Sequence, residues 1–187
     1  RRWQSSGPSW TVELCRLDGL VSKAGDVTGR LPGPDMQPDA ITVLFDGNGL
    51  AVHDMVALSG AHTVGMARCV QFRTHVYCDA NVSPAFATQQ RQLCPASGGD
   101  AGLAPLDPLT PNEFDNGYYR NLMSGAGLLR SDQELFSGGS QDALVQQYSS
   151  SPSQFSADFV TAMLKMGGLL PSSGTQTEVR LNCRRPN

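Results

Sequence analysis

The spacing of apolar residues predicts a chain built mainly of short amphipathic helices. Apolar positions recur every three or four residues in several segments, and stretches rich in Gly and Pro separate these segments. The predicted helices cover residues 39–45, 54–64, 84–93, 114–124, 141–150 and 153–166, with 66–75 as a candidate continuation of the second. Two β-prone runs, 10–14 and 178–181, are candidates to pair with each other. The predicted fold class is therefore mainly α with minor β.

One predicted helix carries a lone histidine on an otherwise apolar face. In residues 54–69, DMVALSGAHTVGMARC, the side chains of Met55, Leu58 and His62 recur at helical spacing, and Asp54 is the candidate N-cap. An imidazole in a dry interior needs a partner for each nitrogen. A metal on one nitrogen and a carboxylate on the other would satisfy both. A hydrogen-bonded core histidine is the alternative, and judged on this segment alone it is the commoner case.

Composition and charge argue against several classes of function. The 187 residues suffice for one domain with a sizeable core, and 40% of them are hydrophobic. The net charge is −3 and the basic residues are dispersed, so nothing favours nucleic-acid binding. No apolar run reaches the ~20 residues that a membrane span needs, and no signal peptide opens the chain. The five cysteines form no CxxC pair, so their spacing does not favour zinc.

Several collinear motifs resemble the plant secretory (class III) haem peroxidases. The segment DMVALSGAHTVG resembles their proximal haem-ligand signature, and further matches follow in the family's order. They are GPSWTVELCRLDG (7–19), LPGPD (31–35), FDGNGL (45–50), PLDPLTPNEFDNGYYRNL (105–122), GLLRSDQELF (127–136), FVTAMLKMGGL (159–169) and GTQTEVRLNCR (174–184). The resemblance implies the proximal-side part of the plant haem peroxidase fold over residues 7–187, after a divergent segment at 1–6.

The resemblance implies haem b as a cofactor. It makes His62 the axial ligand of the iron and Asp132 the carboxylate that orients this histidine. A carboxylate bonded to the other nitrogen makes the imidazole more electron-donating. The alternative for Asp132 is a helix N-cap before residues 133–136, which is compatible with the first role. Pro32 matches the rim where aromatic donors approach the haem edge, and a rigid loop explains it equally well.

The resemblance also implies calcium. Residues 107–115 hold two carboxylates and a hydroxyl in a proline-stiffened loop, whose composition alone favours a capped turn and whose order is not that of an EF-hand. The ligands that the resemblance implies are Thr63, Asp107, Thr110, Glu113 through its carbonyl, and Asp115. Since Thr63 adjoins the histidine, such an ion would connect the ligand helix to this loop.

The five cysteines cannot all pair within the chain, because their number is odd. The resemblance implies a disulfide between Cys69 and Cys94. It leaves Cys15, Cys78 and Cys183 without a family partner, and the alternative for each of the three is a buried free thiol.

The function that the resemblance implies is oxidation of small phenolic donors with hydrogen peroxide. Relatives also carry an Arg-x-x-x-His segment on the opposite haem face, and this sequence has none; His53 and His75 are predicted to be solvated surface residues. We therefore expect a truncated peroxidase of low activity that exposes its haem face and self-associates through it. The alternative is a catalytically silent remnant that binds calcium or a partner. The family implies a secreted or vacuolar location, and Asn81 begins a glycosylation sequon.

Overall fold

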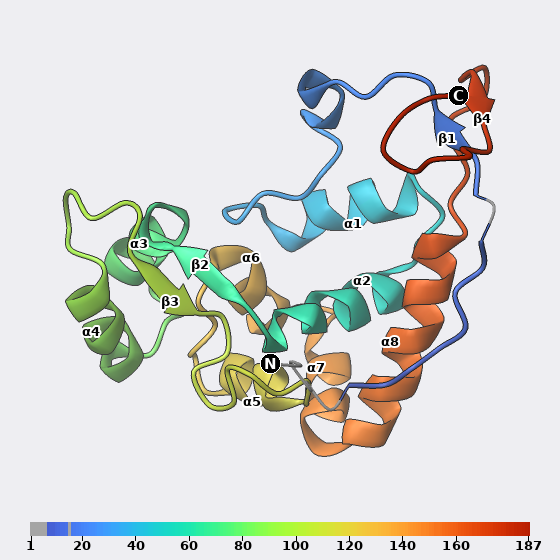
Figure 1. Ribbon diagram of the computed structural model, residues 1–187. Helices are drawn as coiled ribbons and strands as arrows, with labels where there is room; N and C mark the ends of the chain where they lie inside the picture. Colours follow the sequence, from blue (N-terminus) through green and yellow to red (C-terminus); the bar gives the residue numbers. More distant parts are fainter. Residues whose placement is uncertain (1–6, 15) are drawn as a thin grey trace.

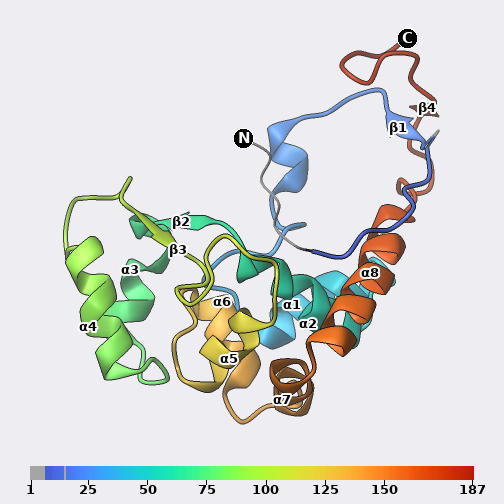
Figure 2. The ribbon, with the colours of Figure 1, turned by 60° about the horizontal axis from the view of Figure 1, so that its bottom comes forward.

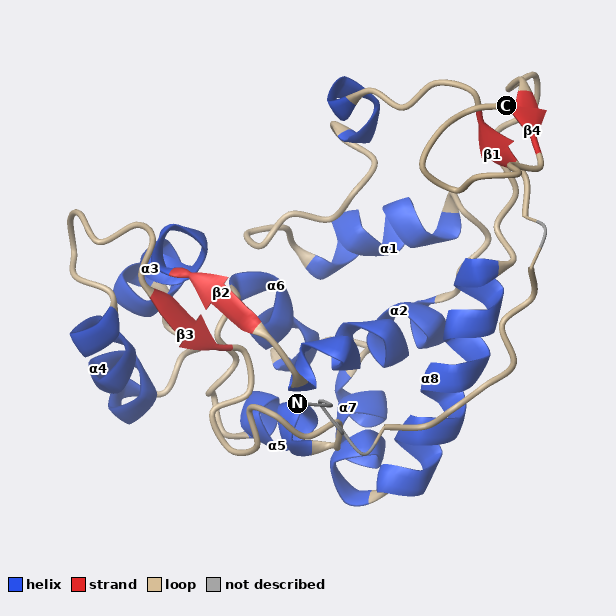
Figure 3. Cartoon of the chain, viewed as in Figure 1, coloured by secondary structure: helices blue, strands red, loops and turns tan. Residues whose placement is uncertain are grey.

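The computed structural model describes residues 7–14 and 16–187, and helices dominate this part of the chain (Figures 1 and 3). The expectations for segment 1–6 and for Cys15 lie outside the described residues. In chain order the elements are β1 (Asp18–Gly19), η1 (Ala24–Val27), α1 (Pro38–Asp46), α2 (Val52–Ser59), η2 (Gly60–Thr63), β2 (Met66–Arg68), α3 (Cys69–Cys78), α4 (Pro84–Leu93), β3 (Leu103–Pro105), α5 (Gly117–Met123), α6 (Arg130–Gln133), η3 (Glu134–Phe136), α7 (Asp142–Ser150), α8 (Pro152–Gly167) and β4 (Thr177–Glu178).

The mainly α prediction is confirmed, and most of the predicted helices form where the apolar spacing placed them. Helix α4 has the predicted bounds, α7 begins one residue later than predicted, and α1 and α8 are each one residue longer at both ends. Proline opens α1, α4 and α8, where its missing N–H costs no intrahelical hydrogen bond. The Ser151 hydroxyl also accepts a bond from the Gln154 N–H at the start of α8 (3.4 Å).

The predicted helix over 54–64, with its continuation to 75, is wrong in detail. Helix α2 begins earlier and ends at Ser59, and the tighter 3-10 turn η2 carries His62. Asp54 is not the N-cap; it lies in the first turn and accepts the Ala51 N–H (2.9 Å). Gly65 then adopts φ +116°, a conformation that L side chains rarely take, and the chain leaves the helix for β2.

The two-stranded pairings also differ from the sequence prediction. Strand β1 pairs antiparallel with β4, so residues 10–14 form no strand, and only Glu178 of the run 178–181 lies in one. Strand β2 pairs antiparallel with β3, and Met66 lies opposite Pro105. The sequence did not predict this pair, because neither segment shows an alternation of apolar and polar residues. Helix α5 begins at Gly117 rather than at residue 114, because the preceding residues belong to an oxygen-rich loop.

The buried apolar side chains form two separate clusters. The larger lies among α2, α5, α7 and α8 and includes Met55, Tyr119 and Phe155, each at most 1% exposed. The smaller lies among α3, α4, β2 and β3 around Phe72. Figure 2 shows these two groups of elements on opposite sides of the molecule. The segment from His62 to Met66 connects them, so the histidine lies between the two clusters.

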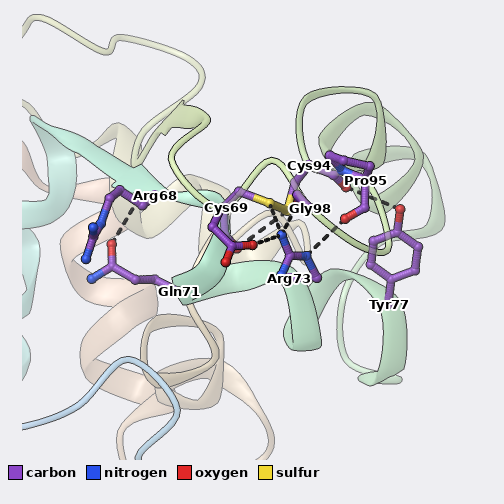
Figure 4. Close-up of a disulfide and its surroundings, with 9 residues drawn as sticks. Arg68, Cys69, Gln71, Arg73, Tyr77, Cys94, Pro95 and Gly98 are labelled. Carbon is purple, nitrogen blue, oxygen red and sulfur yellow. Dashed lines mark hydrogen bonds and ion pairs between the residues drawn. A yellow bond between two sulfur atoms is a disulfide. The ribbon is translucent and has the colours of Figure 1, made fainter.

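The predicted disulfide between Cys69 and Cys94 is confirmed, and it joins α3 to the end of α4 (Figure 4). Arg73 reinforces it: one guanidinium nitrogen lies 3.2 Å from the Cys69 sulfur, and another donates to the Pro95 carbonyl (3.0 Å). Cys78 and Cys183 are exposed free thiols in the described part of the chain, so the buried-thiol alternative is wrong for both.

His53 is exposed as predicted, but His75 is completely buried, which corrects the surface prediction. Its polar sequence neighbours were misleading, because helix α3 turns this position inward. His75 Nδ1 donates to Asp79 Oδ2 (2.6 Å), and Nε2 lies 3.2 Å from the Gly127 carbonyl oxygen. Arg130 also donates to the Asp79 carboxylate (2.7 Å from Nε), so this cluster joins α3 to α6.

None of the described helices combines the length and apolar character that crossing a bilayer requires.

Removing the disulfide should lower stability substantially. The bond closes a loop of 25 residues, which restricts the unfolded chain and is worth about 3 kcal/mol for a loop of this order. The variant Cys69→Ala/Cys94→Ala should therefore melt roughly 6–12 °C below the parent in calorimetry. Cys78→Ala is the control, since its exposed thiol should not change the Tm. Equal melting of the double variant and the parent would contradict this assignment.

The Asp79 cluster should contribute to acid sensitivity. Burial alone would raise the pKa of Asp79, but hydrogen bonds from Arg130 and His75 outweigh it, and the pKa is lowered. The cluster therefore stabilises the fold above the unfolded-state pKa of about 3.9 and loses this contribution as the pH falls through the lower folded-state pKa. Asp79→Asn should lower the Tm near neutral pH and flatten its fall in acid. Asp46→Asn, which changes an exposed carboxylate, is the control; an unchanged acid limb in Asp79→Asn would refute the prediction.

Candidate functional site

The position of His62 depends on close packing of η2 against α5 and α8. A Cβ atom on Gly60 would lie 2.4 Å from the Tyr119 hydroxyl and 2.5 Å from a ring carbon of Phe155. Neither ring can move freely, because both are fully buried. Glycine therefore lets the chain approach these helices closely, and this approach fixes the direction in which the following histidine leaves the core.

His62 is held by Asp132, which lies 70 residues away in the sequence. The imidazole Nδ1–H donates to Asp132 Oδ1 (2.8 Å), and the Tyr118 hydroxyl donates to the same oxygen (2.9 Å). The rings of His62 and Tyr118 also meet edge to face, with centroids 6.3 Å apart. Asp132 lies inside α6, whose N-cap is Leu129, so the N-cap alternative for Asp132 is wrong.

Electrostatics reinforces this pair. Attraction to the Asp132 carboxylate raises the pKa of His62 above its usual value, although partial burial acts in the opposite direction. Burial, followed by the nearby Asp132 charge, raises the pKa of Tyr118 well above its ordinary value, so this phenol stays a hydrogen-bond donor. Asp132 Oδ2 is buried and has no hydrogen-bond partner among the described residues. The carboxylate therefore acts on the histidine through Oδ1 alone.

A cavity of about 370 Å³ opens beside His62. Its walls are largely apolar and come from the loop before α1, from α1 itself, from the end of α2 and from the residue before α6; the apolar lining includes Pro32, Pro34, Ile41, Phe45, Leu58 and Leu129. The Pro34 carbonyl accepts the Ser131 N–H (3.0 Å), which fastens the proline loop to α6. Because Asp132 occupies Nδ1, His62 Nε2 is the nitrogen available to a group in this cavity, and it makes no hydrogen bond within the described residues.

These features fit the haem that the sequence implies. The cavity offers an apolar wall, and a half-exposed imidazole (39% of its side chain) presents an unengaged nitrogen there. Asp132 fixes the tautomer, since an ionised carboxylate can only accept a hydrogen bond and the proton must therefore lie on Nδ1. Pro32, the predicted donor-rim residue, lies in the wall of the same cavity.

The five predicted calcium ligands converge around Thr63, the last residue of η2. The Thr63 hydroxyl lies 3.2 Å from Asp107 Oδ2 and 3.4 Å from both Asp115 Oδ1 and the Glu113 carbonyl oxygen. The Thr110 hydroxyl lies 3.3 Å from Asp107 Oδ2 and 3.1 Å from Asp115 Oδ1. Five oxygens thus face one another. Their donors are the two hydroxyls and the N–H groups of Gly117 (2.6 Å from Asp115 Oδ1) and Asp115 (3.5 Å from the Thr63 hydroxyl), so acceptors remain in excess, which favours a bound cation.

Gly117 shows how closely these oxygens crowd. A Cβ atom there would lie 2.6 Å from Asp107 Oδ2 and 2.8 Å from both Asp115 Oδ1 and the Thr110 hydroxyl. Asp107 is fully buried, and its other oxygen accepts the Asn121 amide (2.7 Å). No three His, Cys, Asp or Glu side chains gather around a metal position in the described residues, so a cation here would also need the hydroxyl and carbonyl oxygens.

Two residues of the site were missed in the sequence. Tyr118 shares the Asp132 oxygen with His62, and Asn121 orients the carboxylate of Asp107. Both lie on α5, where they read as an ordinary helix face, and the sequence contains no local pattern that connects them to partners 14 residues away. Asn81, the predicted glycosylation site, is partly buried, and its amide nitrogen donates to Glu134 (3.0 Å).

Comparison with known proteins identifies the family. A family model described as peroxidase matches residues 3–151. The chain is similar to Peroxidase 70 of Zea mays, with 49% identity over 183 residues, or 97% of this chain and 57% of that protein. It is similar to Peroxidase P7 of Brassica rapa subsp. rapa, with 46% identity over 186 residues, or 98% of this chain and 63% of that protein. Peroxidase 66 of Zea mays is 50% identical over 181 residues, or 97% of this chain and 56% of that protein.

The chain spans about three-fifths of the length of these curated relatives. The family model covers most of the chain, and identity near 50% extends over almost all of it. The chain therefore belongs to the peroxidase family, in its plant class III branch.

Proposed function

We propose that this chain forms the proximal, ligand-bearing side of a haem peroxidase that oxidises small phenolic donors with hydrogen peroxide. The observation that carries the proposal is His62, whose Nδ1 is held by the buried Asp132 and whose Nε2 is available to an apolar cavity. Haem b, when bound, would supply the two-electron reduction of peroxide and the one-electron oxidation of donors. His62 would hold the iron, and Pro32 would lie where donors approach.

The protein residues keep the ligand basic and oriented. Asp132 accepts the Nδ1 proton, which makes the imidazole a stronger electron donor at Nε2. Tyr118 donates to the same oxygen and so limits how much negative charge the carboxylate directs to the histidine. The apolar wall around Ile41 and Phe45 would exclude water from the ligand face, which strengthens these electrostatic effects.

We also propose that Thr63, Asp107, Thr110, Asp115 and the Glu113 carbonyl hold calcium. Calcium takes several oxygen ligands of mixed type, and the excess of acceptors in this cluster supports that choice. Because Thr63 directly follows His62 in η2, the ion would fix the backbone that presents the imidazole.

We also propose a cellular location, a glycosylation site and a surface for self-association. The disulfide supports a secreted or vacuolar location, because such bonds persist in oxidising compartments. Glycosylation at Asn81 would use an amide that already donates to Glu134 and could keep this bond through its remaining N–H. Self-association would proceed through the apolar cavity face beside His62. The alternative, a catalytically silent remnant that binds calcium or a partner, is not better supported, because the oxygen cluster around Thr63 fits both hypotheses equally.

Haem titration tests the proposed iron ligand directly. His62→Ala should lose the absorption spectrum of a histidine-ligated haem, because Nε2 is the nitrogen available in the cavity. Asp132→Asn should keep that spectrum and weaken haem binding by about 10–100-fold, the usual cost of removing a carboxylate behind a ligand histidine. His53→Ala is the control, since His53 lies outside the cavity. The same histidine-ligated spectrum in His62→Ala and the parent would overturn the assignment.

Calcium should stabilise the protein through the 107–115 loop. Calcium at a hundred times its Kd should raise the unfolding free energy by about 2.7 kcal/mol, and a chelator should reverse the effect. Gly117→Ala should weaken this response, because its methyl group would fill the space that the oxygens surround. Gly25→Ala is the matched control, because a methyl group there would meet no other atom within 4 Å. A Tm that does not respond to calcium at constant ionic strength would count against the site.

A further inference from the structure

A continuous series of aromatic rings extends from His62 into the core. The Tyr118 ring lies 6.3 Å from the imidazole, the Tyr119 ring 5.0 Å from Tyr118, and the Tyr148 ring 5.0 Å from Tyr119, measured between centroids. The first two tyrosines lie on α5 and the third on α7, which run below α2 in Figure 1. All three side chains are at most 1% exposed. Electrons tunnel efficiently between rings in such close contact.

The two end tyrosines each donate to a carboxylate. Tyr118 donates to Asp132 Oδ1 (2.9 Å), and Tyr148 donates to Asp158 Oδ2 (3.0 Å). Tyr119 between them has only backbone carbonyls as acceptors, those of Val56 (2.9 Å) and Ala57 (3.4 Å), and a carbonyl oxygen is a very weak base. A phenol that loses an electron becomes strongly acidic, so a radical forms most readily where a base can take the proton.

Tyr148, at the outer end of the series, is buried but contacts two residues that reach the surface. Asp158 is 16% exposed and His53 52% exposed by side chain, and His53 Nε2 lies 3.3 Å from the Tyr148 hydroxyl. Burial, followed by the Asp158 hydrogen bond, raises the pKa of Tyr148 far above its ordinary value. The phenol is therefore neutral at physiological pH, and its oxidation must move a proton together with the electron.

We propose that Tyr118, Tyr119 and Tyr148 form a one-electron relay between His62 and the surface at His53 and Asp158, where a phenolic donor too bulky for the cavity is oxidised. The relay rests on the proposed function, because its oxidant would be the haem after reaction with peroxide. A second series leads from Tyr119 through Phe155 and Phe159 to Trp10, but benzene rings are much harder to oxidise than phenols. Tyr148 is therefore the favoured end of the relay.

Electrons and protons are conserved in each step of the relay. Tyr148 gives one electron through Tyr119 and Tyr118 to the oxidant at His62, and its hydroxyl proton moves to the Asp158 carboxylate. A neutral phenoxyl radical and a carboxylic acid result. The surface donor then gives one electron to the radical, the carboxylic acid returns its proton to Tyr148, and the oxidised donor releases its own proton to solvent as it becomes a phenoxyl radical.

A light-triggered oxidant tests the relay without haem. A ruthenium bipyridyl complex can be coordinated to His62 Nε2 in the full chain carrying His53→Gln, since His75 is buried with both nitrogens engaged. Illumination with an external electron acceptor turns the complex into a one-electron oxidant. The nitroso spin trap 2-methyl-2-nitrosopropane then marks radical positions, which mass spectrometry of peptides locates. The relay predicts adducts at Tyr148.

Two variants decide the outcome. Tyr119→Phe, which preserves the ring, should abolish most of the Tyr148 adduct, whereas the control Tyr77→Phe in the other core cluster should not change it. Asp158→Asn should also lower the Tyr148 adduct, and it leaves the buried rings intact if Tyr119→Phe does not fold. A Tyr148 adduct that persists in both variants, or no Tyr148 adduct in the parent, overturns the relay. Since no haem is present, either result is independent of the haem titration.

Discussion

The architecture of the site depends on one carboxylate oxygen. Asp132 Oδ1 accepts hydrogen bonds from His62 on η2 and Tyr118 on α5, and α6 holds Asp132 itself. A buried carboxylate is costly unless it is paired, and here its second oxygen has no partner among the described residues. The free energy of this charge therefore depends on the two donors remaining in place, which fixes η2, α5 and α6 relative to one another.

The oxygen-rich loop constrains the same turn from the other side. Thr63 directly follows His62, and its hydroxyl faces the carboxylates of Asp107 and Asp115. Close packing at Gly60 fixes where η2 begins. A four-residue turn is thus held at its start by packing, at its histidine by a charged hydrogen bond and at its end by converging oxygens. The three constraints explain how a half-exposed imidazole is presented in one orientation.

The sequence predicted the helices whose positions follow from local apolar spacing. It did not predict features that depend on contacts between residues far apart in the chain. The 3.6-residue spacing located α4, α7 and α8 because each buries one apolar stripe. His75 was misplaced, because the Gly127 carbonyl beside its Nε2 is 52 residues away and comes close only in the fold. The resemblance supplied His62 with Asp132 and the calcium ligands, and these residues do lie close together. Tyr118 was missed because its role is a hydrogen bond between helices, which leaves no local pattern.

We propose that Asp132 would tune the bond that His62 Nε2 forms with the iron when haem is bound. Resonance Raman spectroscopy of the ferrous haem complex measures the iron–histidine stretching frequency, which rises as the imidazole gains negative character. We expect a lower frequency in Asp132→Asn than in the parent, because an amide cannot attract the Nδ1 proton as a carboxylate does. Equal frequencies in the two proteins would contradict it.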